Sequence, residues 1–498
     1  MTIKNDPVKF KELHFSDLFQ VSGLERLDQR FLQTLKENNP ELQKRLLAYR
    51  QADAPLPPVE TSELLLALAP FAEKTIAQLF GIEQELTSSQ TTTLSHDVVL
   101  EFKKSFVLRR ARRYRGEITQ TFDELDNWLS AQLHSAQPDN SDRELSIAEF
   151  GQTLLANETG EEARIEKLTQ WCVLALNDMA GRKAVTGWTS FKLPDRIDHA
   201  RLVPFRRSEQ HGVEIFTCDP SSLHRRDGFK LTDPRMPPRA VQGEINYCIY
   251  CHDKDGDFCS KGFPEKKGQP ELGLKVDPLG VTLTGCPLEE KISEMHVLKR
   301  DGHTIAALAM AMVDNPMVPA TGHRICNDCM KGCIYQKQDP VNIPQIETRV
   351  LTDVLALPWG VEIYDLLTRW NPLRQRQYLP QPFNGRKVLV AGMGPAGFTM
   401  AHHLTMEGCA VVGIDGLKIE PLPEDILRQP VRNWSDLEES LDERILLGFG
   451  GVAEYGITIR WDKNFLKLIY LTLARRSTFQ VFGGVRLGGT LTGAKCAS

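Results

Sequence analysis

Long apolar runs are missing from this 498-residue chain. The longest apolar stretches, such as Ile305–Val313 and Val388–Met393, fall far short of the roughly 20 residues that a membrane-spanning helix needs. The opening sequence, MTIKNDPVKFKELHF, also has no apolar segment of the kind found in secretory signals. We therefore expect a cytoplasmic protein without a membrane span.

An excess of charge of either sign is also lacking. The net charge is −5 and the isoelectric point is about 6.2. Neither nucleic acid nor an anionic membrane is therefore expected as a partner. Residues 1–240 contain no internal repeat and no recognisable catalytic motif. Their apolar residues recur at helical spacing, as at Leu24, Leu27 and Phe31, so this region is predicted to be mostly helical and is assigned no role.

Two features of this helical region have ordinary structural interpretations. The basic run from Lys103 to Arg115 is predicted to be a solvated helix face paired with nearby acids, and the alternative is a phosphate or partner contact. Cys172 stands alone in a predicted helix over Ile165–Met179, which indicates a buried structural thiol.

Cysteine is scarce over most of the chain but concentrated in one region. Seven of the eleven cysteines are spaced as Cys248-x2-Cys251-x7-Cys259, Cys286-Pro287 and Cys326-x2-Cys329-x3-Cys333. In a reducing compartment, clustered cysteines are more often metal ligands or redox groups than disulfides. Three kinds of site fit. They are two [4Fe-4S] clusters, zinc sites with His252 or His323 as added ligands, and a redox dithiol at Cys248 and Cys251. Two such clusters need eight ligands, so the seven cysteines leave one ligand to be found.

A glycine-rich motif follows the cysteines. After a short predicted strand at 386–391, the chain reads Gly392-Met393-Gly394-Pro395-Ala396-Gly397, the GxGxxG fingerprint of a dinucleotide site. A helix over Phe398–Glu407 and a second strand over Ala410–Ile414 are predicted next. Asp415 then lies 23 residues after Gly392, where a carboxylate would hold the adenosine ribose. This pattern predicts the opening of a doubly wound α/β domain.

These two motifs belong to a longer resemblance. The stretch from Cys248 to Gly456 resembles the small (beta) subunit of glutamate synthase and the N-terminal half of dihydropyrimidine dehydrogenase, over roughly 200 of the 498 residues. Further matching segments are Gly285-Cys286-Pro287-Leu288, Asp314-Asn315-Pro316, Thr321 to Cys326, Pro340 to Ile343 with Glu347, and Gly450 to Ile457. Their combined order is specific, although no single segment is.

The resemblance implies two [4Fe-4S] clusters and an FAD that accepts hydride from NADPH. It implies that the first cluster is held by Cys248, Cys251, Cys259 and Cys333. It implies that the second cluster is held by Cys286, Cys326 and Cys329, with Glu347 as the eighth ligand. It implies that FAD is held by Gly392, Gly394, Pro395, Ala396, Gly397, Asp415, Gly450 and Gly451. No catalytic side chain is assigned.

The chain departs from the family pattern in three places. Between Cys259 and Cys286 lie 26 residues, many more than the family has there. A second insertion occupies about 416–448. The family continues into an NADPH domain, whereas this sequence stops at Ser498. We therefore expect either a fragment or a protein whose remainder lies on another polypeptide, with weakened FAD binding and no nicotinamide site of its own.

The predicted fold is multidomain, with three parts. Residues 1–240 form the helical region, and residues 241–372 form an α-helical domain with two iron–sulfur clusters. Residues 384–498 form an incomplete Rossmann-type α/β domain for FAD. The predicted function is an electron-input oxidoreductase that passes electrons from NAD(P)H-reduced FAD, through the clusters, to an unidentified acceptor subunit or domain. The alternative is a zinc-binding interaction or assembly module with a non-catalytic Rossmann unit.

Overall fold

The computed structural model describes most of the chain. The described residues are 6–136, 142–203, 205–218, 220, 223, 231, 234–254, 256–321, 326–443, 447–455 and 462–493. His323, a candidate zinc ligand, and the end of the glycine-rich segment at Gly456 and Ile457 lie outside them. Helices make up 54% of the structure, beside two small sheets. Among the described residues, no helix is long and apolar enough to cross a membrane.

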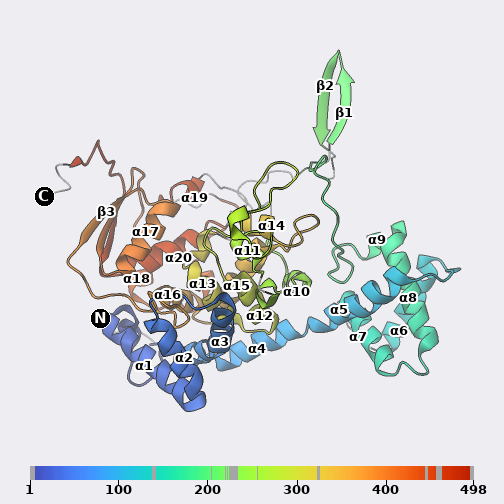
Figure 1. Cartoon of the computed structure of the whole chain (residues 1–498), viewed down its shortest axis with the longest axis horizontal. Coiled ribbons are helices and arrows are strands. Elements are labelled where there is room, and N and C mark those ends of the chain that lie inside the picture. Colours follow the sequence, from blue (N-terminus) through green and yellow to red (C-terminus); the bar gives the residue numbers. More distant parts are fainter. Residues whose placement is uncertain are drawn as a thin grey trace.

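A group of helices forms the N-terminal part (Figure 1). They are η1 (Phe15–Phe19), α1 (Val21–Asn38), α2 (Pro40–Gln51), α3 (Pro58–Phe80) and α4 (Glu83–Leu94). The predicted helical spacing is confirmed, because Leu24, Leu27 and Phe31 are all buried on one side of α1. Asn39 starts α2 by accepting the amide of Leu42 at 3.1 Å.

A second helical group stands to one side of the body (Figure 1). It contains α5 (Asp97–Phe102), the π-helix η2 (Lys103–Arg110), η3 (Ala111–Arg113), α6 (Phe122–Ala136), α7 (Arg143–Ala156), α8 (Glu162–Asn177) and α9 (Met179–Ala184). Its core is separate from the main one and centres on Trp171, whose indole donates to Asp126 at 2.9 Å. Cys172 is fully buried in this core, as predicted.

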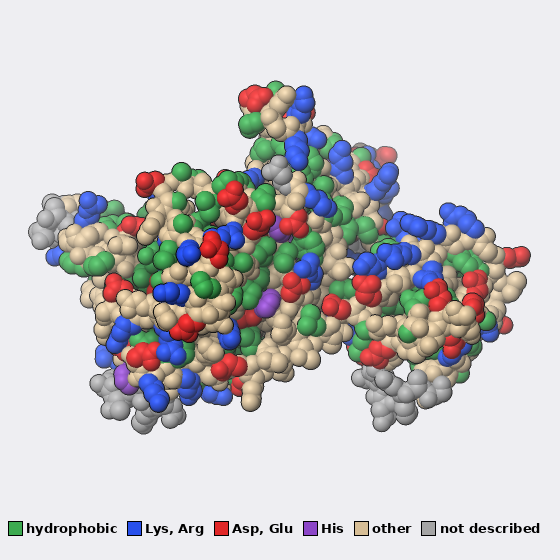
Figure 2. Space-filling model, turned by 60° about the horizontal axis from the view of Figure 1, so that its bottom comes forward, with side chains coloured by type: hydrophobic (Ala, Val, Ile, Leu, Met, Phe, Trp, Pro, Cys, Tyr) green, Lys and Arg blue, Asp and Glu red, His purple; other side chains and the backbone are tan. Residues whose placement is uncertain are grey.

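The basic run lies on the surface of this group. Lys104 pairs with Glu101 at 2.9 Å, and Arg110 pairs with Glu158 at 2.8 Å, as the solvated-face interpretation predicts for these two residues. Lys103 is instead partly buried. Figure 2 shows basic side chains gathered over this part of the molecule, with acidic side chains among them.

A β-hairpin interrupts the helical half and was not predicted. Strands β1 (Phe205–Gln210) and β2 (Val213–Cys218) pair antiparallel and project from the body (Figure 1). Its two turn residues, His211 and Gly212, have φ values of 55° and 77°, as a tight hairpin turn requires. Both faces of the hairpin are largely exposed, so the sequence carries no apolar alternation that would mark it.

The cysteine-rich region is built from short helices around one long apolar helix. Its elements are α10 (Pro238–Tyr247), η5 (Cys251–Lys254), α11 (Phe258–Lys261), η6 (Pro270–Leu272), α12 (Ile292–Arg300), α13 (Thr304–Asp314), η7 (Val318–Ala320), α14 (Asp328–Gly332), α15 (Ile343–Leu355) and α16 (Gly360–Arg369). Helix α13, predicted over Thr304–Val313, is almost completely buried and packs against α3, α12 and α15. Glu347 lies within α15.

Three parallel strands form the C-terminal sheet. The order is β3 (Lys387–Ala391), β4 (Ala410–Ile414), β5 (Phe479–Phe482), with α17 (Pro395–Met406) between the first two strands and α20 (Phe465–Ala474) before the third. The short helices α18 (Glu424–Arg428), η8 (Trp434–Asp436) and α19 (Val452–Tyr455) lie in the insertion between β4 and α20. The predicted strand–helix–strand order is thus present, while the assignment to an FAD-binding Rossmann domain stays a prediction.

The N-terminal helices share one hydrophobic core with the cysteine-rich region and the C-terminal sheet. This core runs from Phe10 to Phe479. Polar contacts reinforce it, because the indole of Trp370 donates to Asp28 at 2.9 Å and Arg50 pairs with the same carboxylate at 2.8 Å. The described residues therefore form two hydrophobic cores, and the predicted domain limits at 240, 372 and 384 stay a prediction.

Candidate functional site

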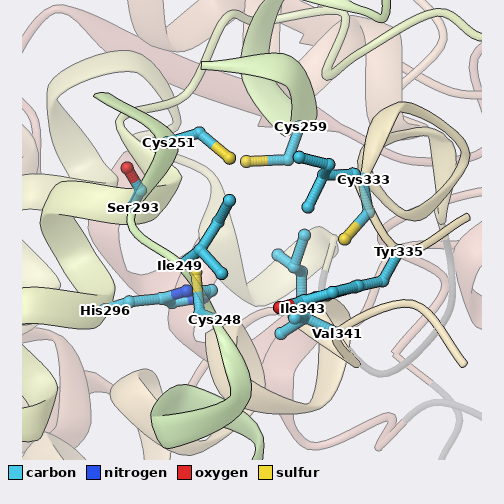
Figure 3. A pocket seen from close by; sticks show the side chains of 11 residues that line it. Cys248, Ile249, Cys251, Cys259, Ser293, His296, Cys333, Tyr335, Val341 and Ile343 are labelled. Carbon is cyan, nitrogen blue, oxygen red and sulfur yellow. The ribbon is translucent and has the colours of Figure 1, made fainter. Parts of the chain in front are cut away.

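Four cysteine side chains surround one buried cavity. Cys248 follows α10, Cys251 begins η5, Cys259 lies in α11 and Cys333 follows α14 (Figure 3). The cavity has a volume of about 20 Å³ and is partly open to solvent. Its other lining residues, mostly apolar, are Ile249, Ser293, His296, Ile334, Tyr335, Val341 and Ile343. The structure thus brings together the four residues that the resemblance assigns to the first cluster, and their role as ligands stays a prediction.

Local backbone turns direct these thiols into the cavity. Tyr250 has a left-handed φ of 51°, which reverses the chain between Cys248 and Cys251, and its amide donates to the Cys248 sulfur at 3.4 Å. Asp257, with φ of 46°, starts α11 and turns Cys259 toward the same space. Left-handed backbone at non-glycine residues is uncommon and marks sites where function constrains the chain.

Burial keeps these thiols protonated when no metal is bound. It raises the pKa of Cys248 to about 12 and that of Cys251 to about 11, and it also raises the pKa values of Cys259 and Cys333. The nearby sulfurs add a smaller effect, because Cys251 and Cys333 both raise the pKa of Cys248. A metal centre would therefore displace protons from this site, and a bound cation is what stabilises buried thiolates.

The arrangement does not match a site for a single metal ion. Across the described residues, no group of three or more His, Cys, Asp or Glu side chains is placed to hold one ion. His252, a candidate zinc ligand, hydrogen-bonds through Nδ1 to the hydroxyl of Ser293. The kind of metal centre that these thiols would hold stays a prediction.

A second group of candidate ligands adjoins the first. Burial raises the pKa of Cys329, and the next causes are the charges of Glu347, Cys286, Glu290 and Cys326. These groups therefore lie near Cys329, which is buried in α14, while Cys326 is exposed. The amide of Cys286 donates to the carbonyl of Cys259 at 2.9 Å, so one backbone contact links the two groups.

Glu347 is held in place by two neighbours. Its carboxylate accepts hydrogen bonds from Asn315 at 3.0 Å and from the Thr321 hydroxyl at 2.6 Å. Both neighbours belong to segments that carry the resemblance. They orient the carboxylate near Cys286, Cys326 and Cys329, although its role as a ligand stays a prediction.

Two buried polar residues at these groups were missed by the sequence analysis. Glu290 is buried, and no described residue hydrogen-bonds to its Oε1; burial, followed by the charge of Glu347, raises its pKa far above the usual range. His296 lines the first cavity, and within the described part of the chain neither of its ring nitrogens has a partner. Burial lowers the pKa of His296 to about 3, so the ring is neutral. The sequence of α12, ISEMHVLKR, mixes charged and apolar residues and gave no signal that His296 would be buried.

The glycine-rich loop connects β3 to α17. Gly392 has φ of 98°, and a Cβ on Gly397 would lie 1.8 Å from the carbonyl oxygen of Gly392, so both positions require glycine. Pro395 and Ala396 form the first turn of α17. A second glycine pair packs against this loop, because the Gly450 amide donates to the carbonyl of Met393 at 3.0 Å. Gly450 and Gly451 both have left-handed φ values, 106° and 54°.

Asp415 lies at the end of β4 beside this loop. Its carboxylate accepts the amide of Met393 at 2.8 Å and the amide of Leu417 at 2.9 Å. Both oxygens therefore bind the protein's own backbone, and binding of a ribose would require them to share or exchange these bonds. The predicted ribose contact stays a prediction.

Comparison with known proteins gives relatives of two kinds. Residues 8–81 match the family model described as the RP005 N-terminal alpha-helical domain. The uncharacterised protein RP006 of Rickettsia prowazekii is 56% identical over 176 residues, which are 35% of this chain and 25% of that protein. RP005 of the same organism is 26% identical over 302 residues, which are 58% of this chain and 96% of that protein.

The second kind of relative has a named activity. The glutamate synthase [NADPH] small chain of Mycobacterium tuberculosis is 30% identical over 162 residues, which are 32% of this chain and 30% of that protein. The chain thus spans a quarter to a third of the length of RP006 and of this small chain. The predicted resemblance is therefore confirmed as a distant similarity, over about a third of the chain, to an oxidoreductase subunit.

Proposed function

We propose that this chain is an electron-input module that holds two [4Fe-4S] clusters and FAD and passes electrons from NAD(P)H to an acceptor subunit or domain. The observation that carries the proposal is the set of four thiols from separate chain segments around one buried cavity. A second group of three cysteines and a glutamate lies directly beside it. The glutamate synthase small chain supplies the precedent for the class of reaction.

The residues present fit both kinds of cofactor. The buried thiols give an iron–sulfur cluster its ligands, and the apolar residues around them limit access of water. The glycine loop leads into the N-terminus of α17, where backbone amides favour a bound pyrophosphate. When bound, such cofactors exchange hydride for single electrons, and the protein positions them and adjusts their potentials.

The decisive experiment measures metal and flavin in the anaerobically purified chain. We expect about eight irons per chain and visible absorption that bleaches on reduction. Replacing Cys259→Ser removes one thiol of the first group and is expected to lower iron by about four atoms per chain. Cys172→Ser is the matched control, since Cys172 is an equally buried thiol far from these groups.

Two outcomes would contradict the proposal. A colourless protein that carries zinc would favour the assembly module instead. Equal iron loss in Cys259→Ser and Cys172→Ser would show that the iron is held through general stability of the fold, and not by the first group of thiols.

A further inference from the structure

A large cleft separates the second helical group from the cysteine-rich region. It has a volume of about 820 Å³, which is within the usual range for small-molecule sites. One wall is formed by η2, α8, α9 and the segment 185–195, and the other by α10 with Cys248, Ile249 and Tyr335. Those last three residues also line the first cysteine cavity, so the cleft ends directly beside it.

Aromatic surfaces line the cleft from both sides. Trp188 is half-buried on the wall of the second helical group. On the opposite wall, Tyr247 and Tyr335 stack with ring centroids 4.2 Å apart and an interplanar angle of 15°. Such surfaces favour a ligand with a planar, largely apolar body.

The cleft also carries an excess of positive charge. Its basic residues are Lys103, Lys104, Arg112, Arg182 and Lys192, and its acidic residues are Asp195, Glu244 and Asp339. Lys104 pairs with Glu101, and Lys192 pairs with Glu244. Within the described part of the chain, Lys103, Arg112 and Arg182 form no ion pair with an acid.

Lys103 is the cation that lies deepest. It opens the π-helix η2, a rare geometry that often occurs at functional sites. Burial lowers the pKa of its ammonium, and the charge of Glu244 opposes this effect only in part. An ammonium that is partly desolvated without an ion-pair partner is best stabilised by an anion from outside the chain.

We propose that this cleft binds an organic anion with a planar apolar body, such as an aromatic carboxylate or sulfonate. Lys103 would face the anionic group, while Trp188 and the Tyr247–Tyr335 pair would contact the apolar body. The proposed ligand would then sit next to Cys248. Binding in the cleft does not depend on the cofactors of the proposed function.

The test uses 8-anilinonaphthalene-1-sulfonate, a fluorescent aromatic anion, titrated into the full chain. We expect saturable binding that Lys103→Met weakens about fivefold or more, as loss of one partly buried charge contact would do. Ala240→Trp, which fills the cleft from α10, is expected to abolish the saturable signal. Lys74→Met is the matched control, because Lys74 is an exposed lysine of α3 away from the cleft.

A neutral probe tests the charge requirement. N-phenyl-1-naphthylamine has the same ring system without the sulfonate and should bind at least fivefold more weakly. Equal binding of the two probes, or unchanged anion binding in both Lys103→Met and Ala240→Trp, would overturn the proposal. Circular dichroism of each variant verifies that it is folded.

The iron content of the same samples shows whether a negative result contradicts the cleft inference or the proposed function. Iron-free protein that binds the anion at the cleft supports this inference and contradicts the proposed function. Iron-loaded protein that fails to bind the anion contradicts this inference alone.

Discussion

At the scale of single residues, two buried side chains beside the cysteine groups carry polar atoms without a partner among the described residues. His296 and Glu290 are both buried. Among the described residues, neither ring nitrogen of His296 forms a hydrogen bond, and neither does Oε1 of Glu290. An unpaired buried polar group costs about 1–3 kcal/mol of folding stability. Such groups are expected where a bound cofactor supplies the missing partner. His296, which is neutral and lines the first cavity, can donate one N–H to a sulfur there.

Replacing His296→Leu tests that hydrogen bond. A hydrogen bond to cluster sulfur favours the reduced, more negative state, so its loss should lower the reduction potential of the first cluster. A net hydrogen-bond energy of about 0.5–1.5 kcal/mol corresponds to roughly 20–65 mV for one electron. Anaerobic potentiometric titration followed by electron paramagnetic resonance measures the change.

The variant His296→Gln keeps an N–H donor and serves as the control. It should recover much of the potential lost in His296→Leu. An unchanged potential in the leucine variant, with iron content retained, would show that His296 does not contact the cluster.

At the scale of secondary-structure elements, one acidic side chain connects α3 to the apolar helix α13. The carboxylate of Glu73 accepts hydrogen bonds from the amides of Ile305 at 2.8 Å and Ala306 at 3.1 Å. A side chain of α3 therefore caps the N-terminus of α13, a role that is usually played by the residue just before a helix. The same carboxylate accepts from Nδ1 of His303 at 2.8 Å. This contact ties the N-terminal helices to the centre of the cysteine-rich region.

The His303–Glu73 contact predicts a pH dependence of stability. The hydrogen bond to Glu73 raises the pKa of His303, with a smaller effect from Asp301. A histidine whose pKa is higher in the folded protein stabilises the fold fully at pH values below its pKa in the unfolded chain, which is about 6.5. This stabilisation is lost as the pH rises through the pKa of the folded protein. We expect His303→Gln to lower the free energy of unfolding by roughly 1 kcal/mol more at pH 6 than at pH 8.5, measured by urea denaturation.

The exposed His134 of α6 provides the comparison for this experiment. His134→Gln should change stability equally little at both pH values. If His303→Gln lowers the free energy of unfolding equally at pH 6 and pH 8.5, the protonated ring of His303 does not stabilise the fold.

At the scale of the whole molecule, the two hydrophobic cores of the described residues do not follow the order of the sequence. The first core joins the N-terminal helices to the later parts of the chain, and the second core is formed by residues that lie between them in the sequence. Leu68 of α3 belongs to the main core with the cysteine-rich region and the C-terminal sheet. Leu168 of α8 belongs to the separate core of the second helical group. The cleft lies between the two, so it depends on how both units fold.

Matched leucine substitutions test this division. Leu168→Ala and Leu68→Ala each empty a fully buried site and should cost about 2–5 kcal/mol in the unit concerned. We expect two calorimetric transitions, with Leu168→Ala lowering only the transition of the second helical group. Leu68→Ala should lower the other transition, in which the cysteine-rich region melts. One transition that shifts equally in both variants would contradict two independent units.

The sequence by itself determined the local elements and the chemistry that they carry. Apolar periodicity predicted the buried face of α1 and the helix α13, because helical spacing is a local property. The glycine motif and the strand Ala410–Ile414 were likewise predicted from neighbouring residues. The cysteine spacing predicted a metal or redox site and left open which kind. The exposed hairpin β1–β2 escaped prediction because no face of it is buried.

Contacts between residues far apart in the chain depend on tertiary packing, although the family resemblance already implied the grouping of Cys333 with Cys248. Cys333 reaches the cavity of Cys248 from 85 residues away, and spacing alone does not indicate that approach. His296 is buried because helices from other parts of the chain pack around it. The N-terminal helices and the cysteine-rich region share one core for the same kind of reason, since their contacts join segments far apart in the sequence. The cleft arises where two separate cores lie side by side. The spacing of apolar residues predicts local structure, because it depends on neighbours along the chain. Buried side chains, ion pairs and cavities arise from contacts between segments that are far apart in the sequence.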